Sequence, residues 1–180
     1  MSEISDRYSN IASAFSARVG GVQDWTSPSP CEGWLARDVV AHVVGVHRGV
    51  LAQVAGGEPV ALGAEDDVAG AWTDATSALH TALLDPVAAG STVPSPFGPM
   101  PLEQLVGRII CTDTLVHTWD LARATGQDEQ LDADAVSGAF AGLKPMDAMI
   151  RTPGLFGAKL EAPAGCDAQT EFLNFLGRAV

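Results

Sequence analysis

Apolar residues recur at helical spacing over four long stretches of the chain, and runs rich in Pro and Gly separate these stretches. The stretches are residues 5–19, 35–54, 65–84 and 102–125. Apolar side chains three or four residues apart lie on one face of a helix, which must be buried against other helices. The pattern therefore predicts an all-α fold, a bundle of four helices.

The segments between and after these stretches have a different character. Residues 85–101 carry several Pro residues, so we expect an extended crossover segment without helix there. Beyond Gly126, apolar spacing predicts short extra helices at about 132–143, 146–150 and 169–178. A chain of 180 residues is long enough for one well-buried core, so we expect residues 1–180 to form a single domain.

Composition excludes some classes of partner. The net charge of −12 argues against nucleic acid, because a basic surface cannot dominate so acidic a chain. No apolar run approaches the roughly 18–20 residues of a membrane span, and the first residues do not resemble a secretory signal. The odd number of cysteines, Cys31, Cys111 and Cys166, is typical of reduced thiols, so we expect a cytoplasmic protein.

Asp113 and His117 stand out in the fourth stretch because they are polar residues in an apolar helix. They are four positions apart, so they lie one turn apart on the same helix face. Burying a carboxylate and an imidazole is unfavourable unless something binds both. A divalent metal would satisfy this requirement, although an ordinary side-chain contact has the same spacing.

A third ligand must come from elsewhere in the chain. Of the other histidines, His42 lies on the apolar stripe of residues 35–54, whereas His80 lies off the stripe of its own helix. His47 is about 140° around the helix from His42, so we expect only one of the two to point inward, and we choose His42. Three ligands with an open position are typical of catalytic zinc sites, but a hydrogen-bonded core histidine remains an alternative.

Two phrases resemble a known family. Residues 30–45 read Pro-Cys-Glu-Gly-Trp-Leu-Ala-Arg-Asp-Val-Val-Ala-His-Val-Val-Gly, and residues 113–126 contain His-Thr-Trp-Asp-Leu-Ala. Together with Pro96-Phe-Gly98 they occur in the order found in the DinB-like superfamily. More narrowly, they resemble the actinobacterial branch related to the N-terminal domain of mycothiol-dependent maleylpyruvate isomerase. The resemblance covers about residues 5–130.

This resemblance implies a fold, a metal site and a cosubstrate. The fold is an up-down-down-up four-helix bundle, and the metal ligands are His42, Asp113 and His117. The metal is expected to be divalent, zinc or nickel. Characterised relatives use it to bind and activate a low-molecular-weight thiol such as mycothiol, because a metal stabilises the nucleophilic thiolate.

The chain also departs from the family pattern. Where this chain has Asp113, many DinB-like proteins have a third histidine and the isomerase branch commonly has Glu. Leu35 occupies a helix N-cap position that usually carries Thr or Ser. The isomerase has a further C-terminal domain that contributes to its active site, and we expect this chain to lack it. We therefore expect a thiol reaction other than maleylpyruvate isomerisation.

Further residues are candidates for roles around the metal. Asp120 shares the helix face of the pair, so it either orients a ligand histidine or anchors the Trp-containing loop. Trp34, Trp119 and Arg123 are candidates for the substrate pocket, with structural packing as the alternative for the two Trp residues. Cys31 has no histidine nearby in the sequence and is expected to be a packed loop residue.

The leading functional prediction is a divalent-metal-binding, mycothiol-type S-transferase that acts on small electrophiles. The alternative is a non-catalytic metal-binding or stress-related module of the same fold, and a third possibility is a metal-free helical scaffold in which the triad is a buried polar network. Enzymatic activity, as a metal- and mycothiol-dependent transferase or isomerase, stays open. The sequence assigns no catalytic residue. The expected partners are a small-molecule thiol and an electrophile, with no nucleic acid and no membrane, and a homodimer is kept among the expectations.

Overall fold

The computed structural model describes residues 2–151 and 156–180. The chain divides into two compact units, Met1–Glu129 and Gln130–Val180, each with its own internal packing. The expectation of one domain over residues 1–180 stays a prediction. In the described ranges, no helix is both long enough and apolar enough to cross a membrane.

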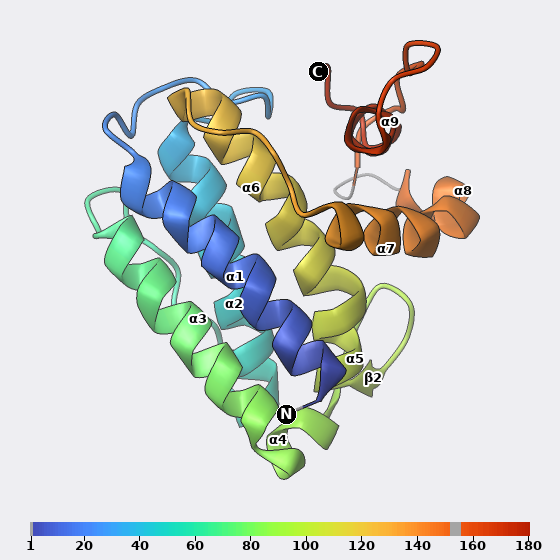
Figure 1. Cartoon of the computed structure of the whole chain (residues 1–180). Coiled ribbons are helices and arrows are strands. Elements are labelled where there is room, and N and C mark those ends of the chain that lie inside the picture. The colour runs from blue at the N-terminus through green and yellow to red at the C-terminus, as the bar shows by residue number, and fades with distance from the viewer. Residues whose placement is uncertain (1, 152–155) are drawn as a thin grey trace. The chain divides into compact units, whose positions relative to one another are not determined.

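The first unit is a bundle of four helical rods. These are α1 (Glu3–Gly21), α2 (Ala36–Ala55), α3 (Val68–Leu84), and a rod made of α5 (Leu102–Leu105), a π turn (Val106–Ile110) and α6 (Cys111–Thr125). Both α3 and α6 pack against α1 and α2. Figure 1 shows α1 and α6 running in one direction and α2 and α3 in the other. The predicted all-α, up-down-down-up bundle is confirmed.

Local chemistry sets the ends of these helices. The Asp67 side chain accepts hydrogen bonds from the N–H groups of Ala69 and Gly70 at the start of α3. At the end of α6, Gly126 adopts a left-handed conformation with φ of 65°, which favours glycine. Leu35 cannot cap α2 with its side chain, and Asp38 instead accepts the N–H of Leu35 at 2.9 Å.

The crossover segment is only partly extended. It contains a two-stranded antiparallel sheet of β1 (Thr92–Val93) and β2 (Met100–Pro101). The prediction that it has no helix was wrong at its start, where α4 (Pro86–Gly90) forms. Proline is tolerated in a first helical turn because its missing N–H would have no partner there, and Asp85 caps the N–H of Val87.

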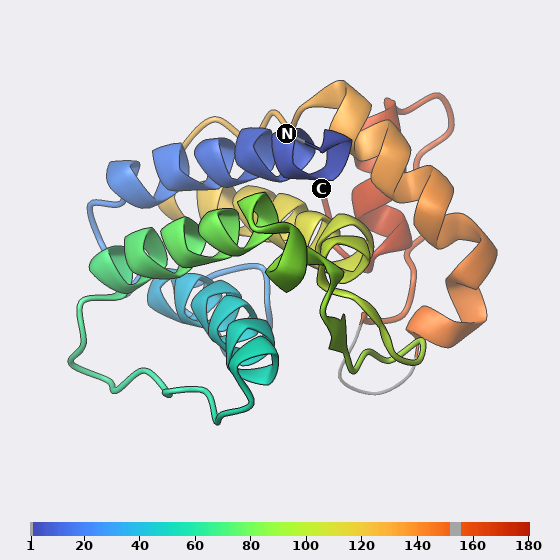
Figure 2. The ribbon, with the colours of Figure 1, turned by 90° about the horizontal axis from the view of Figure 1, so that it is seen from below.

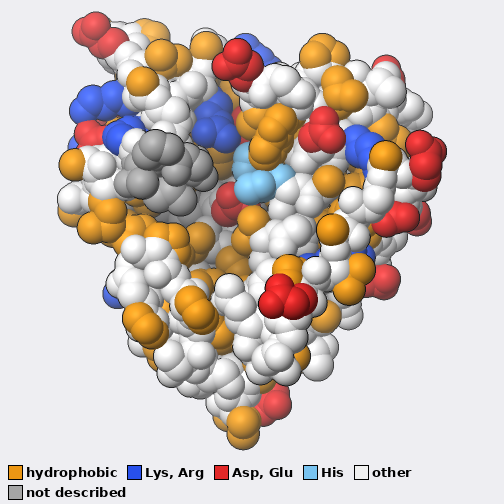
Figure 3. All heavy atoms as spheres, turned by 180° about the vertical axis from the view of Figure 1, so that it is seen from behind, with side chains coloured by type: hydrophobic (Ala, Val, Ile, Leu, Met, Phe, Trp, Pro, Cys, Tyr) orange, Lys and Arg blue, Asp and Glu red, His pale blue; other side chains and the backbone are white. Residues whose placement is uncertain are grey.

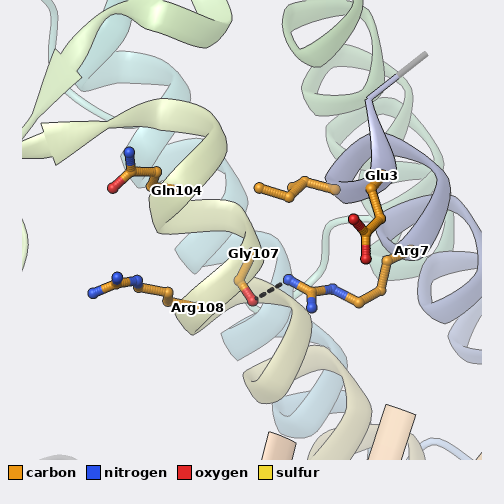
Figure 4. A pocket seen from close by; sticks show the side chains of 6 residues that line it. Glu3, Arg7, Gln104, Gly107 and Arg108 are labelled. Carbon is orange, nitrogen blue, oxygen red and sulfur yellow. Dashed lines mark hydrogen bonds between the residues drawn. The ribbon is translucent and has the colours of Figure 1, made fainter. Parts of the chain in front are cut away.

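The π turn was not predicted either, since the sequence pattern there fits a regular helix. Nη2 of Arg7 in α1 donates to the carbonyl of Gly107 at 2.8 Å, at the edge of a surface hollow (Figure 4). A Cβ atom at position 107 would lie 2.8 Å from the same nitrogen, so glycine makes room for this contact. A π turn inserts one residue and so rotates α6 relative to α5.

A chain of hydrogen bonds crosses the apolar core of the bundle. His47 is fully buried, and its Nδ1–H donates to the carbonyl of Val43 at 2.8 Å. Its Nε2 therefore accepts from the Tyr8 hydroxyl at 3.0 Å, and Tyr8 in turn accepts from Thr76 at 2.9 Å. The expectation that His42 and not His47 points inward was wrong, because His47 lies among the buried valines and His42 is half-buried.

The second unit contains the short helices expected after Gly126. They are α7 (Ala133–Leu143), a 3-10 turn (Lys144–Met146), α8 (Asp147–Ile150) and α9 (Ala168–Phe175). Phe140 of α7 packs against Phe172 and Phe175 of α9, with ring centroids 5.9 and 5.3 Å apart. Arg151 donates to the carbonyls of Gly157 and Phe175.

Acid is expected to destabilise the bundle through His47. Burial lowers the pKa of His47 from 6.5 to about 4, so between these pH values the unfolded chain binds a proton that the folded chain does not. Stability therefore rises with pH over this window and falls as the pH is lowered. From pH 7 to pH 4 the wild type should lose about 3 kcal/mol relative to His47→Gln.

Urea unfolding followed by Trp fluorescence measures this difference in the first unit, which contains Trp25, Trp34, Trp72 and Trp119. His80→Gln on α3 is the matched control, because His80 is partly exposed. Equal pH dependence in the wild type and His47→Gln would contradict the assignment of His47 as a buried neutral group.

Candidate metal centre

The three residues expected to bind a metal come together in the first unit. His42 is on α2, and Asp113 and His117 lie one turn apart on α6, which packs against α2. Oδ1 of Asp113 lies 3.2 Å from Nε2 of His42 and 3.5 Å from Nε2 of His117. One ligand atom from each residue lies within 4.8 Å of the other two.

The protonation of His117 follows from its other neighbour. Nδ1 of His117 lies 2.9 Å from Oδ2 of Asp120, a fully buried carboxylate that can only accept a hydrogen bond. Nδ1 therefore carries a proton and donates it to Asp120. In a neutral His117, Nε2 would then present its lone pair to Oδ1 of Asp113, so two acceptors would face each other. A proton between the two atoms, or a metal ion bound by both, would make this contact favourable.

The donor set fits a metal ion. A tetrahedral ion with N and O ligands at about 2.0–2.2 Å separates its ligand atoms by roughly 3.3–3.6 Å. The two distances from Oδ1 of Asp113, 3.2 and 3.5 Å, are close to this range. The other oxygen, Oδ2, is buried and has no hydrogen-bond partner among the described residues. Two imidazoles and one carboxylate would leave a coordination position open.

The same contacts favour the charged forms of both His117 and Asp113. Burial alone would lower the pKa of His117, but the charge of Asp113 and hydrogen bonds to Asp113, Asp120 and Cys31 outweigh it and raise the pKa well above its ordinary value. Burial alone would raise the pKa of Asp113, yet the attraction of His117 and hydrogen bonds from both histidines lower it. The site therefore favours a positive charge, for which protons and a metal ion compete.

The loop before α2 covers one side of these histidines. The ring of Trp34 lies 5.1 Å from that of His42 and 5.9 Å from that of His117, between ring centroids. Trp34 is half-buried, and His42 keeps 35% of its side chain exposed. On the face drawn in Figure 3, a histidine side chain reaches the surface beside hydrophobic and acidic side chains. A small molecule can therefore approach the triad.

The other pocket candidates lie differently. Trp119 is fully buried, and the Arg123 guanidinium lies over its ring at 5.3 Å. Arg123 also forms an ion pair with Glu129 at 2.8 Å. No described contact joins Trp119 or Arg123 to the triad, so their part in substrate binding stays a prediction, whereas Trp34 contacts the two histidines directly.

Cys31, expected only to be a packed loop residue, contacts Asp120 beside the site. Its Sγ lies 3.4 Å from Oδ2 of Asp120, and Cys31, His117 and Asp120 form a second group of clustered potential metal ligands. Cys31 and Asp120 are 89 residues apart, so distance along the chain hid the contact. One signal was available, because the loop carrying Cys31 leads directly into the helix of His42. Asp120 thus contacts both the ligand histidine and the Trp-containing loop, the two roles that the sequence had posed as alternatives.

Comparison with known proteins assigns the chain to a family. Residues 8–122 match the model of the mycothiol maleylpyruvate isomerase N-terminal domain family. The chain belongs to this family. Proteins from two strains of Mycobacterium tuberculosis, each named only as an uncharacterized protein, are 32% identical to this chain over an alignment of 172 residues. The alignment covers 93% of this chain and 93% of each relative. None of the solved structures matches the chain significantly.

The match to the mycothiol maleylpyruvate isomerase N-terminal domain family spans every residue of the site, from Cys31 and Trp34 to Asp120. The resemblance inferred from the two sequence phrases is thereby confirmed. Family membership and the clustered ligand atoms support a mycothiol-related domain with a candidate metal site.

The hydrogen bond from His117 to Asp120 is expected to control metal affinity. In Asp120→Asn the amide can donate to Nδ1, which places the proton on Nε2, where it would block metal binding. Loss of such a supporting partner typically lowers metal affinity about 10- to 100-fold. Competition titration with a chromophoric zinc chelator measures this change. The control is Asp74→Asn, an exposed carboxylate on α3, and equal affinities of the two variants would refute the role of Asp120.

Proposed function

We propose that this protein is a metal-dependent S-transferase that joins a mycothiol-type thiol to a small electrophile. His42, Asp113 and His117 would hold a divalent metal, zinc or nickel, in the first unit. The observation that carries the proposal is that Oδ1 of Asp113 faces Nε2 of His117 while Nδ1 of His117 already donates to Asp120. Membership of a mycothiol-related family supports the choice of thiol.

A divalent metal at this position would lower the pKa of a thiol and hold it as a thiolate, the nucleophilic form. The residues of this chain would supply the remaining conditions. Asp120 keeps the Nδ1 proton on His117, so that Nε2 is free to act as a ligand. Trp34 covers the two imidazoles on one side and limits access of water, and the exposed part of His42 leaves a path for reactants.

The proposed reaction balances simply. The thiolate sulfur attacks an electrophilic carbon and a C–S bond forms. A leaving group such as a halide departs with its electron pair, and the thiol proton passes to solvent. With an activated double bond as electrophile, the sulfur adds to one carbon and a proton is taken up at the other, so no leaving group is needed.

The proposal is tested with zinc- or nickel-loaded protein, purified mycothiol and a chromogenic aryl halide. Turnover should require both metal and mycothiol, and His117→Ala should reduce it to the uncatalysed rate. His80→Ala, a partly exposed histidine on α3, should retain it. Stoichiometric metal binding without thiol-dependent turnover, for aryl halides and activated alkenes alike, would contradict transfer and support the non-catalytic metal-binding module.

A further inference from the structure

The loop before α2 places the Cys31 thiol firmly. The N–H of Trp34 donates to the carbonyl of Cys31 at 3.0 Å, which closes a tight turn, and Gly33 within it has φ of 76°. The N–H of Ser29 donates to the carbonyl of Trp34 at 2.9 Å, and the Ser29 hydroxyl accepts the N–H of Cys31 at 3.2 Å. Cys31 and Trp34 thus belong to one hydrogen-bonded turn.

The thiol of this turn contacts the carboxylate that orients His117. Cys31 Sγ lies 3.4 Å from Oδ2 of Asp120, and only the S–H can donate because the carboxylate is an acceptor. The same oxygen accepts the Nδ1–H of His117 at 2.9 Å. Asp120 is fully buried, and a buried charge requires hydrogen-bond donors to remain stable.

We propose that Cys31 is a positioning residue for the metal centre: through Asp120 its thiol holds the imidazole of His117 in place. The turn that contains Cys31 and Trp34 is thereby coupled to metal binding. The metal-binding part of this inference rests on the proposed function. The hydrogen-bond chain from Cys31 through Asp120 to His117 does not, because it joins protein groups alone.

The geometry favours positioning over direct ligation by Cys31. The two ring nitrogens of an imidazole point in different directions, and those of His117 face different carboxylates. Nε2 faces Asp113, on the side of the triad, and Nδ1 faces Asp120. Cys31 contacts Asp120 and so lies on the Nδ1 side, where the nitrogen is already protonated.

Thermodynamic linkage gives the proposal a reciprocal consequence. If the Cys31 hydrogen bond strengthens metal binding by some factor, metal binding must disfavour the state with a released Cys31 by the same factor. An alkylating reagent reacts with the released thiol. Metal should therefore slow alkylation of Cys31 about as much as loss of the thiol weakens metal affinity.

The first experiment compares Cys31→Ala with Cys31→Ser, whose hydroxyl retains a donor. In metal-free protein, the Nδ1 proton of His117 gives a ring N–H signal by ¹H–¹⁵N NMR. This signal should exchange faster with water in the alanine variant and be preserved in the serine variant.

Cobalt titrations measure the metal affinity of the same variants. Cys31→Ala should bind cobalt about 3- to 10-fold more weakly than the wild type, a smaller loss than removal of Asp120 itself would cause. The affinity of Cys31→Ser should stay near that of the wild type. Cys166→Ala, a half-buried cysteine in the second unit, is the control.

The second experiment follows iodoacetamide labelling of wild-type protein by peptide mass spectrometry, with and without zinc, and needs no variant to fold. Labelling of Cys31 should slow with zinc, and labelling of Cys166 should not. Unchanged His117 exchange together with wild-type cobalt affinity in Cys31→Ala would overturn the proposal. A thiolate-to-cobalt charge-transfer band that disappears in Cys31→Ala would also overturn it, because Cys31 would then be a ligand.

These readouts separate the two proposals. If the wild type binds neither zinc nor cobalt, the proposed function fails, and the NMR comparison in metal-free protein still decides whether Cys31 positions His117. If metal binds and Cys31→Ala changes neither affinity nor exchange, the proposed function stands and the role of Cys31 fails.

Discussion

The carboxylate of Asp113 lies between two imidazoles, and the rest of the site depends on how its charge is satisfied. Oδ1 faces Nε2 of both His42 and His117, and the buried Oδ2 has no partner among the described residues. Because Nδ1 of His117 already donates to Asp120, Nε2 of a neutral His117 and Oδ1 of Asp113 are both acceptors, and within the described part of the chain Oδ1 receives its hydrogen bond from Nε2 of His42 alone. A positive charge, either a proton on His117 or a metal ion, makes the second contact favourable, and the distances suit both. This preference links the local geometry to metal chemistry.

The bundle provides this arrangement with few elements. One helix, α6, carries Asp113, His117 and Asp120 on one face, and α2 contributes His42 from the neighbouring rod. The loop leading into α2 adds Trp34 over the imidazoles and Cys31 on Asp120. A further buried histidine, His47, is neutral and hydrogen-bonded to Tyr8 in the core. Two histidines on the same helix thus have different roles, one structural and one at the site.

The sequence predicted the parts that depend on local pattern. Helical spacing of apolar residues gave the four rods, and the spacing of Asp113 and His117 placed both on one face of α6. It did not predict the π turn, which is accompanied by a contact from Arg7 to Gly107 across 100 residues. The prediction that His42 and not His47 is the buried histidine of α2 was wrong. Histidine is compatible with either environment, and Tyr8, the hydrogen-bond partner of His47, lies on another helix. Cys31 was underrated because its contact with Asp120 exists only in the folded chain.

Metal-linked stability tests most directly whether Asp113, held between two histidines, binds a cation. The free energy of unfolding is measured by urea with Trp fluorescence, in chelator and in zinc, for the wild type, Asp113→Asn and His80→Ala. Zinc at 100 times its dissociation constant should stabilise the wild type and His80→Ala by about 2.7 kcal/mol and leave Asp113→Asn unchanged. Equal responses of the wild type and Asp113→Asn to zinc, or no response in either, would contradict the account.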